Sequence, residues 1–218
     1  MSRVRNNFMK PNIIFIQSTR KFSEKEKKQI TGLVRKVFTD ASKDLNIRTL
    51  VNFTFYRFGK NNRGFTKAKD WIDATLPKGR IDFIDLESML YHELHHIARG
   101  YCGYLENGKH YLLNSLFSEG LAISFELEHT SLNRKMTHHK YAFALVKKWL
   151  LKMRKDLYNT KEYDYAGWFH GKEKPKQLGY KIGKYLVDQI KKNHPQMTHK
   201  DLARKDAREL LKLSKVKL

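Results

Sequence analysis

The first hundred residues carry hydrophobic patterns of two kinds. Apolar residues at helical spacing predict a helix over residues 24–45, opened by the capping box of Ser23 and Glu26, and a second helix that ends near Gly100. Shorter apolar or alternating runs predict strands at residues 12–17, 46–58 and 71–76. Residues 59–69 are polar and predict a loop. The expected order is therefore strand, helix, strand, strand, helix.

The second half of the chain is helical by its pattern. Apolar faces of helical period predict helices at residues 111–129, 136–155, 177–193 and 198–214. Residues 159–175 are rich in aromatic side chains and predict a loop. We therefore expect an α+β fold with a single domain over residues 1–218. Its α/β N-terminal lobe spans residues 1–100, and its helical C-terminal lobe spans residues 101–218.

The helix before Gly100 carries ionisable side chains next to its apolar stripe. His92 and His96 are four residues apart, which places them on one face of a helix. Two imidazoles at this spacing can share a zinc ion, and Glu93 can then reach a water at that metal, as in the H-E-x-x-H arrangement of zinc metallopeptidases. The alternative is a histidine-rich helix without a metal. The position of the H-E-x-x-H motif on an amphipathic helix favours the metal site. His95 is expected outside this site, because its side chain is turned by roughly 100° around the helix from the two ligand histidines.

A Glu-Gly pair lies inside the next predicted helix. A glycine inside a helix lowers helix stability by about 1 kcal/mol relative to alanine, so the presence of Gly120 calls for an explanation. One reason is close approach to another helix, with Glu119 as a third metal ligand. The alternative is a surface glutamate beside a tolerated glycine. The two upstream histidines still need a third ligand, and this favours Glu119.

The two motifs together resemble the gluzincin, or thermolysin-like, zinc peptidases. With the Gly-Tyr-Lys-Ile-Gly segment at residues 179–183, the chain is similar to a bacterial family known only as predicted zinc-dependent proteases. The resemblance covers residues 71–187. It implies a zincin-like fold: a small mixed sheet whose edge strand precedes the active-site helix, and a mostly helical C-terminal lobe.

The chain departs from the thermolysin-like pattern at one position. Those enzymes place an aspartate four residues after the ligand glutamate, where it orients a histidine, and this chain has Ile123 there. The orienting group must then come from Glu126, Ser115 or a backbone carbonyl.

The residues in these motifs predict a hydrolytic mechanism. Zn²⁺ held by His92, His96 and Glu119 would activate a water, with Glu93 as the general base. The oxyanion needs a further donor from the C-terminal lobe. The resemblance favours Tyr180 in this catalytic role, and a purely structural tyrosine is the alternative. Other possible donors are His170 and Tyr165. The remaining histidines lack ligand spacing and are expected at the surface: His138, His139, His194 and His199.

The composition bears mainly on partners. The formal net charge is +22, and the excess of basic residues is greatest after residue 130. This charge is compatible with weak, non-specific nucleic-acid binding that falls steeply with salt, although a solvated lysine-rich surface is the alternative. A single cysteine excludes an internal disulfide. No run approaches a membrane span or a signal segment, so we expect no membrane partner and a cytoplasmic protein; the oligomeric state is not indicated.

Three functions are compatible with these residues. The first is a zinc peptidase acting on peptides or proteins, and it is favoured. The second is a metalloprotease resembling the SprT-like group, which acts on proteins bound to nucleic acid. The third is a non-catalytic binding protein that keeps the fold. If residues 71–76 form the sheet edge, a substrate could pair with them as an added strand; a strand buried on both sides is the alternative.

Overall fold

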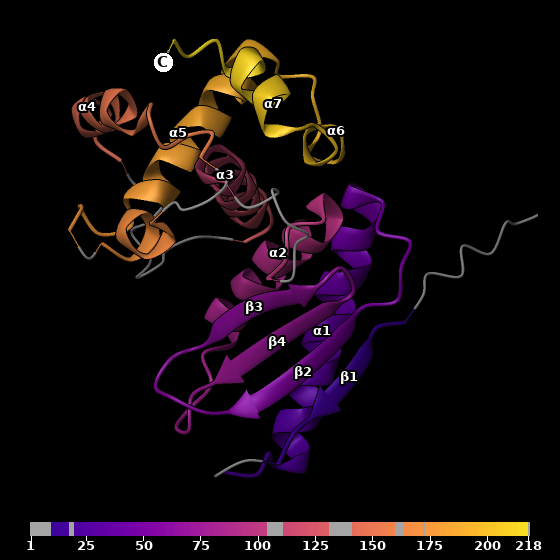
Figure 1. Cartoon of the computed structure of the whole chain (residues 1–218). Coiled ribbons are helices and arrows are strands. Elements are labelled where there is room, and N and C mark those ends of the chain that lie inside the picture. The colour runs from indigo at the N-terminus through magenta and orange to yellow at the C-terminus, as the bar shows by residue number, and fades with distance from the viewer. Residues whose placement is uncertain are drawn as a thin grey trace, which may run out of the picture.

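The computed structural model describes residues 10–17, 20–103, 111–130, 141–159, 164–171 and 173–217. A four-stranded sheet with two long helices forms the N-terminal half, and a group of helices forms the C-terminal half (Figure 1). The fold is therefore α+β, as the sequence predicts. None of the helices in the described parts of the chain has the length and apolar run needed to cross a bilayer.

The sheet has the strand order β1-β2-β4-β3. Its strands are β1 (Asn12–Phe15), β2 (Asn52–Arg57), β3 (Arg63–Ala68) and β4 (Trp71–Leu76). The first three in spatial order run parallel, and β3 pairs antiparallel with β4. The expectation that residues 71–76 form the edge was wrong, because β4 has β2 on one side and β3 on the other.

Strand β3 occupies the segment that the sequence predicted as a polar loop. It forms a hairpin with β4, in which Gly64 is opposite Ala74 and Thr66 is opposite Ile72. Thr66 on its inner face is buried and contacts the helix that carries His92 and His96, whereas Phe65 on the other face is 54% exposed. An edge strand with one apolar side chain at its solvent face carries little of the alternation that predicts strands, which explains the missed assignment.

The two long N-terminal helices begin and end where local chemistry dictates. Helix α1 (Glu24–Leu45) starts at the capping box of Ser23 and Glu26. In helix α2 (Phe83–Arg99), the side chain of Asp82 accepts hydrogen bonds from two backbone N–H groups of the first turn. Gly100 ends α2 in a left-handed conformation with φ of 66°. Both helices lie behind the sheet in Figure 1.

The C-terminal half contains five α-helices and one π-helical turn among the described residues. They are α3 (Leu112–His129), α4 (Phe143–Met153), η1 (Ala166–His170), α5 (Leu178–Asn193), α6 (His199–Ala203) and α7 (Ala207–Ser214). The helix predicted at residues 136–155 is shorter, since α4 begins at Phe143; residues 136–140 lie outside the described residues. The loop predicted at residues 159–175 contains η1.

The helix predicted at residues 198–214 is two helices. Asp206 separates α6 from α7 because its side chain accepts hydrogen bonds from the N–H groups of Arg208 and Glu209, at 2.7 and 2.8 Å. This N-cap starts a new helix and turns the chain. The prediction missed the break because the apolar spacing continues through it.

Each half has a hydrophobic cluster of its own, and helix α3 belongs to both. One joins the sheet to α1 and α2 and includes Phe125 of α3. The other joins α3 to α4, η1, α5, α6 and α7. Helix α3 contributes to both clusters, so it carries Glu119 to the boundary where α2 presents its histidines.

Candidate metal centre

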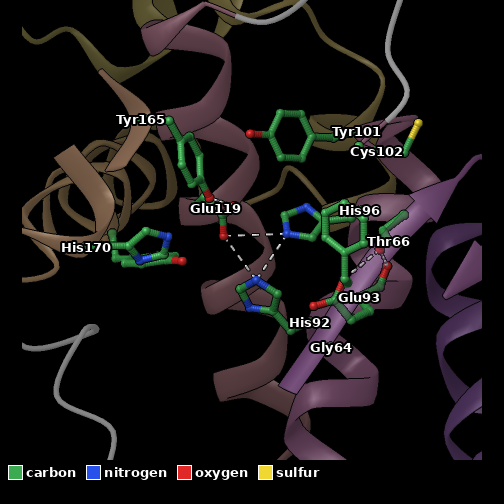
Figure 2. Close-up of a pocket in the computed structure, with 13 residues that line it drawn as sticks. Gly64, Thr66, His92, Glu93, His96, Tyr101, Cys102, Glu119, Tyr165 and His170 are labelled. Atoms are coloured by element: carbon green, nitrogen blue, oxygen red, sulfur yellow. Dashed lines mark hydrogen bonds and ion pairs between the residues drawn. The ribbon is translucent and has the colours of Figure 1, made fainter. Parts of the chain in front are cut away.

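Three side chains from two helices converge at this boundary. His92 and His96 project from α2, and Glu119 projects from α3 (Figure 2). The Nε2 atoms of His92 and His96 are 3.1 Å apart. Oε2 of Glu119 is 3.1 Å from Nε2 of His92 and 3.5 Å from Nε2 of His96. The three residues form a group whose ligand atoms could hold a metal ion.

The spacing of these atoms fits zinc. Zinc takes histidine nitrogen and carboxylate oxygen at about 2.0 to 2.2 Å in a tetrahedron, which places neighbouring ligand atoms about 3.3 to 3.6 Å apart. The observed separations of 3.1, 3.1 and 3.5 Å are close to one face of such a tetrahedron. With these three residues as ligands, the fourth position would be left for water or substrate, as in catalytic zinc sites.

Glycine contacts explain how α3 brings Glu119 into place. A Cβ on Gly120 would lie 2.3 Å from the carbonyl carbon of Gly183 in α5, and a Cβ on Gly183 would lie 2.1 Å from the carbonyl oxygen of Leu116. The two helices therefore cross backbone to backbone. The expectation that Gly120 permits close helix approach is confirmed, and the residue before it points at the histidines.

Glu126 orients the first histidine. Its Oε2 is 3.2 Å from Nδ1 of His92, and its other carboxylate oxygen accepts a hydrogen bond from the hydroxyl of Ser88. A carboxylate behind a ligand histidine fixes its tautomer and raises its basicity. Of the partners proposed to replace the missing aspartate at Ile123, Glu126 lies beside His92, while Ser115 instead accepts a hydrogen bond from the hydroxyl of Tyr101.

The charges at the site suit a cation. Burial opposes a charge on His92, but its hydrogen bonds to Glu119 and Glu126 raise its pKa well above the ordinary value. Burial opposes a charge on Glu119 as well, but the nearby imidazoles of His96 and His92 lower the pKa of its carboxyl. The metal-free site thus keeps an anionic carboxylate and binds a proton where a dication would sit.

Glu93 lies beside the histidines but is held by the edge strand. Its Oε2 accepts a hydrogen bond of 2.7 Å from the hydroxyl of Thr66. A Cβ on Gly64 would lie 2.6 Å from Cγ of Glu93, so the carboxylate packs against bare backbone there. The sequence prediction missed both β3 residues, because nothing in a supposed loop linked them to the helix motif.

An open cavity of about 620 Å³ contains the whole group. His92, Glu93, His96 and Glu119 line it together with the three candidate oxyanion donors, Tyr165, His170 and Tyr180. The hydroxyl of Tyr165 donates to Oε1 of Glu119 at 3.3 Å, and Tyr165 and Tyr180 are hydrogen-bonded to each other. Burial, with the negative charge of Glu119, raises the pKa of both phenols, so they remain protonated donors.

The histidines expected at the surface have different outcomes, and His194, which ends α5, is partly exposed. His95 is fully buried and packs against Phe125 and His199, away from the other two histidines of its motif. The expectation of a surface position for His199 was wrong, since it is 7% exposed; its Nε2 is 3.2 Å from Oε1 of Glu128, on α3. His138 and His139 lie outside the described residues.

Comparison with known proteins agrees with this geometry. A family profile with the description "Predicted Zn-dependent protease (DUF2268)" matches residues 25–212, which include all the side chains of the site. No curated protein and no solved structure matches the chain. The family is described as zinc-dependent, and the chain carries a His–His–Glu group that could bind the metal. The chain therefore belongs to the family described as Predicted Zn-dependent protease (DUF2268).

Proposed function

We propose that the protein is a gluzincin-type zinc metallopeptidase that hydrolyses peptide bonds. The observation that carries the proposal is the triangle of His92, His96 and Glu119, with the carboxylate of Glu93 beside it in an open cavity. A zinc ion bound by the triangle would polarise a peptide carbonyl and lower the pKa of a water.

Glu93 acts as the general base in this proposal. Thr66 occupies Oε2, so we assign proton acceptance to Oε1. Glu93 takes a proton from the water while the water oxygen bonds to the peptide carbonyl carbon. It then gives that proton to the leaving amine nitrogen as the C–N bond breaks. Thr66 and the backbone of Gly64 keep the carboxylate in position throughout.

The two phenols have different roles in this proposal. Tyr165 already donates to Glu119, so its first role is to hold that carboxylate with Oε2 toward the histidines. Tyr180 contacts Tyr165 in the same cavity and is the donor that we assign to the oxyanion. Both phenols lie on the side of the cavity formed by the C-terminal helices, and Glu93 lies on the other.

The edge strand β3 supplies a template for an extended substrate. The carbonyl of Thr66 accepts a hydrogen bond from the N–H of Gly103, so it points away from β4. Backbone groups of an antiparallel strand change side at every residue, and therefore Gly64, two residues earlier, also directs its N–H and C=O outward. These groups lie directly beside Glu93. An extended peptide that pairs with Gly64 brings its carbonyl to the metal triangle.

The replacement Glu93→Gln tests the assignment. It removes the base while it preserves size and the hydrogen bond from Thr66, so the variant should keep its zinc and fold but lose nearly all peptide hydrolysis. Glu87→Gln, on the same helix, is the matched control and should hydrolyse at the parental rate. Elemental analysis and hydrolysis of a mixed peptide library measure the two properties.

Two results would contradict the proposal. Hydrolysis by Glu93→Gln at the parental rate would remove Glu93 from the reaction. A zinc-loaded parent that cleaves no peptide or protein would favour a non-catalytic protein that retains the fold.

A further inference from the structure

Residues 101–103, directly after helix α2, are attached to three different elements. The N–H of Tyr101 donates to the carbonyl of His96 in α2, and its hydroxyl donates to Oγ of Ser115 in α3 at 2.9 Å. The N–H of Gly103 donates to the carbonyl of Thr66 in β3, also at 2.9 Å. Cys102 between them is buried. We name residues 101–103 the capping segment.

The capping segment occupies the outer edge of β3 at Thr66. A Cβ on Gly103 would lie 2.3 Å from Cζ of Phe65, so the segment lies directly on this strand. Exposure alternates along β3: Arg63 and Phe65 are exposed, Gly64 is intermediate and Thr66 is 4% exposed. The hydrogen bond from Gly103 therefore occupies the outer edge of β3 at Thr66, two residues after Gly64.

The segment also forms part of the cavity wall. Tyr101, Cys102 and Gly103 all line the cavity that contains the metal triangle. The ring of Tyr101 packs against the ring of His96, with centroids 5.1 Å apart. A peptide that pairs with Gly64 thus meets this wall toward Thr66, and the exposed Arg63 lies in the opposite direction along β3.

We propose that the capping segment closes one end of the substrate cleft, so that the protein removes short fragments from a peptide end instead of cutting inside long chains. This inference rests on the peptidase function proposed above. Successive outward-facing residues of a strand are about 6.6 Å apart, which leaves space for about two substrate residues between Gly64 and the wall. The scissile bond must then lie within about two residues of one terminus.

Peptides with blocked ends test the inference in the zinc-loaded parent. A library of long peptides is prepared in four forms: unblocked, N-acetylated, C-amidated and blocked at both ends. The expected products arise from bonds close to one terminus. When residues are added between a cleaved bond and that terminus, so that more than about two lie on the side of the wall, the rate of cleavage at that bond should fall at least tenfold. The terminus concerned gives the direction in which substrate pairs with β3. Equal cleavage of interior bonds in long peptides would overturn the closed cleft.

A second measurement does not depend on peptidase activity. The double variant Phe65→Ala/Gly103→Pro removes the N–H donor to Thr66 and makes room for the proline ring, and Phe65→Ala alone is its control. Cys102 is the only cysteine and is 4% exposed, so its reaction with a soluble thiol reagent reports detachment of the segment. The double variant should react at least tenfold faster than the control, and it should also gain interior cleavage.

The outcomes separate the two proposals. Parent protein that loads zinc but cleaves nothing contradicts the peptidase function, and thiol reactivity still tests the attachment of the segment. Equal thiol reactivity in the double variant and the control would contradict the cap. Faster thiol reaction without any change in cleavage position would show that the segment does not limit the substrate.

Discussion

The carboxylate of Glu126 lies 3.2 Å from Nδ1 of His92, and Glu126 is seven residues after Glu119 on the same helix. Seven residues are close to two turns, so both carboxylates face α2. Glu119 reaches Nε2 of His92, the nitrogen that would bind the metal, and Glu126 reaches Nδ1 on the far side of the ring. Helix α3 would therefore supply both a ligand to the metal and the group that orients a second ligand.

Glu126→Gln should weaken zinc binding without abolishing it. An amide keeps the size but loses the charge that favours the orienting hydrogen bond, and loss of such a partner typically costs about 10- to 100-fold in metal affinity. Ser88→Ala, which removes only the donor to Glu126, should have a smaller effect. Competition with a chromophoric chelator measures both affinities. An unchanged affinity in Glu126→Gln would show that the contact is not functional.

Glu119→Gln should reduce bound zinc from about one ion per chain to nearly none. Loss of the anionic ligand leaves two imidazoles, and catalytic zinc sites have three protein ligands. Glu128→Gln, on the same helix with its side chain 49% exposed, should retain the ion. Elemental analysis of protein purified without added metal provides the measurement. Full zinc content in Glu119→Gln would remove this residue from the ligands.

Gly120→Ala should destabilise the protein by about 1 to 3 kcal/mol, because overpacking has a cost of this size and the new methyl group would meet the backbone of Gly183. The control is Gly32→Ala on α1, where no atom other than the nearby backbone of the same helix lies within 4 Å of the new Cβ among the described residues. That change should stabilise the protein by about 1 kcal/mol, since alanine is the better helix former. Denaturant unfolding gives both values. Equal effects of the two substitutions would contradict the tight crossing.

Zinc should stabilise the protein more strongly as pH rises. Despite burial, hydrogen bonds to Glu119 and Glu126 raise the pKa of His92 in the metal-free fold above its ordinary value of 6.5. Protonated His92 thus stabilises the metal-free fold below that pH, and this contribution is lost as pH rises through the folded-state pKa. Zinc binding must displace the same proton. The rise in melting temperature on adding zinc should be larger at about pH 8 than at about pH 6; the opposite order would contradict this linkage.

The sequence was sufficient for the parts of the site that lie within one helix. The helical period of α2 is enough to place His92, Glu93 and His96 together. Glu119, on α3, was predicted from the unexplained glycine beside it. Contacts between distant segments were not predictable in the same way. Tyr165 donates to Glu119 across 46 residues, and Thr66 donates to Glu93 across 27.

The errors have a common cause in tertiary packing. Strand β3 has weak alternation of its own and is stabilised by its hairpin partner and by α2. His199 belongs to a five-residue helix, and its burial depends on His95 and Phe125 from other helices. Neither environment has a local sequence signal, because the neighbouring groups that create it are far away in the chain.

The crossing of α3 and α5 limits how the ligand spacing can be redesigned. Where two helices meet through side chains, a protein engineer can change their separation in small steps by exchanging larger and smaller residues. Gly120 and Gly183 leave no side chain to exchange at this contact, and any addition pushes the helices apart. Selection for another metal, with longer bonds to its ligands, would therefore have to act on the α2 face of the site or on the lengths of the connecting segments.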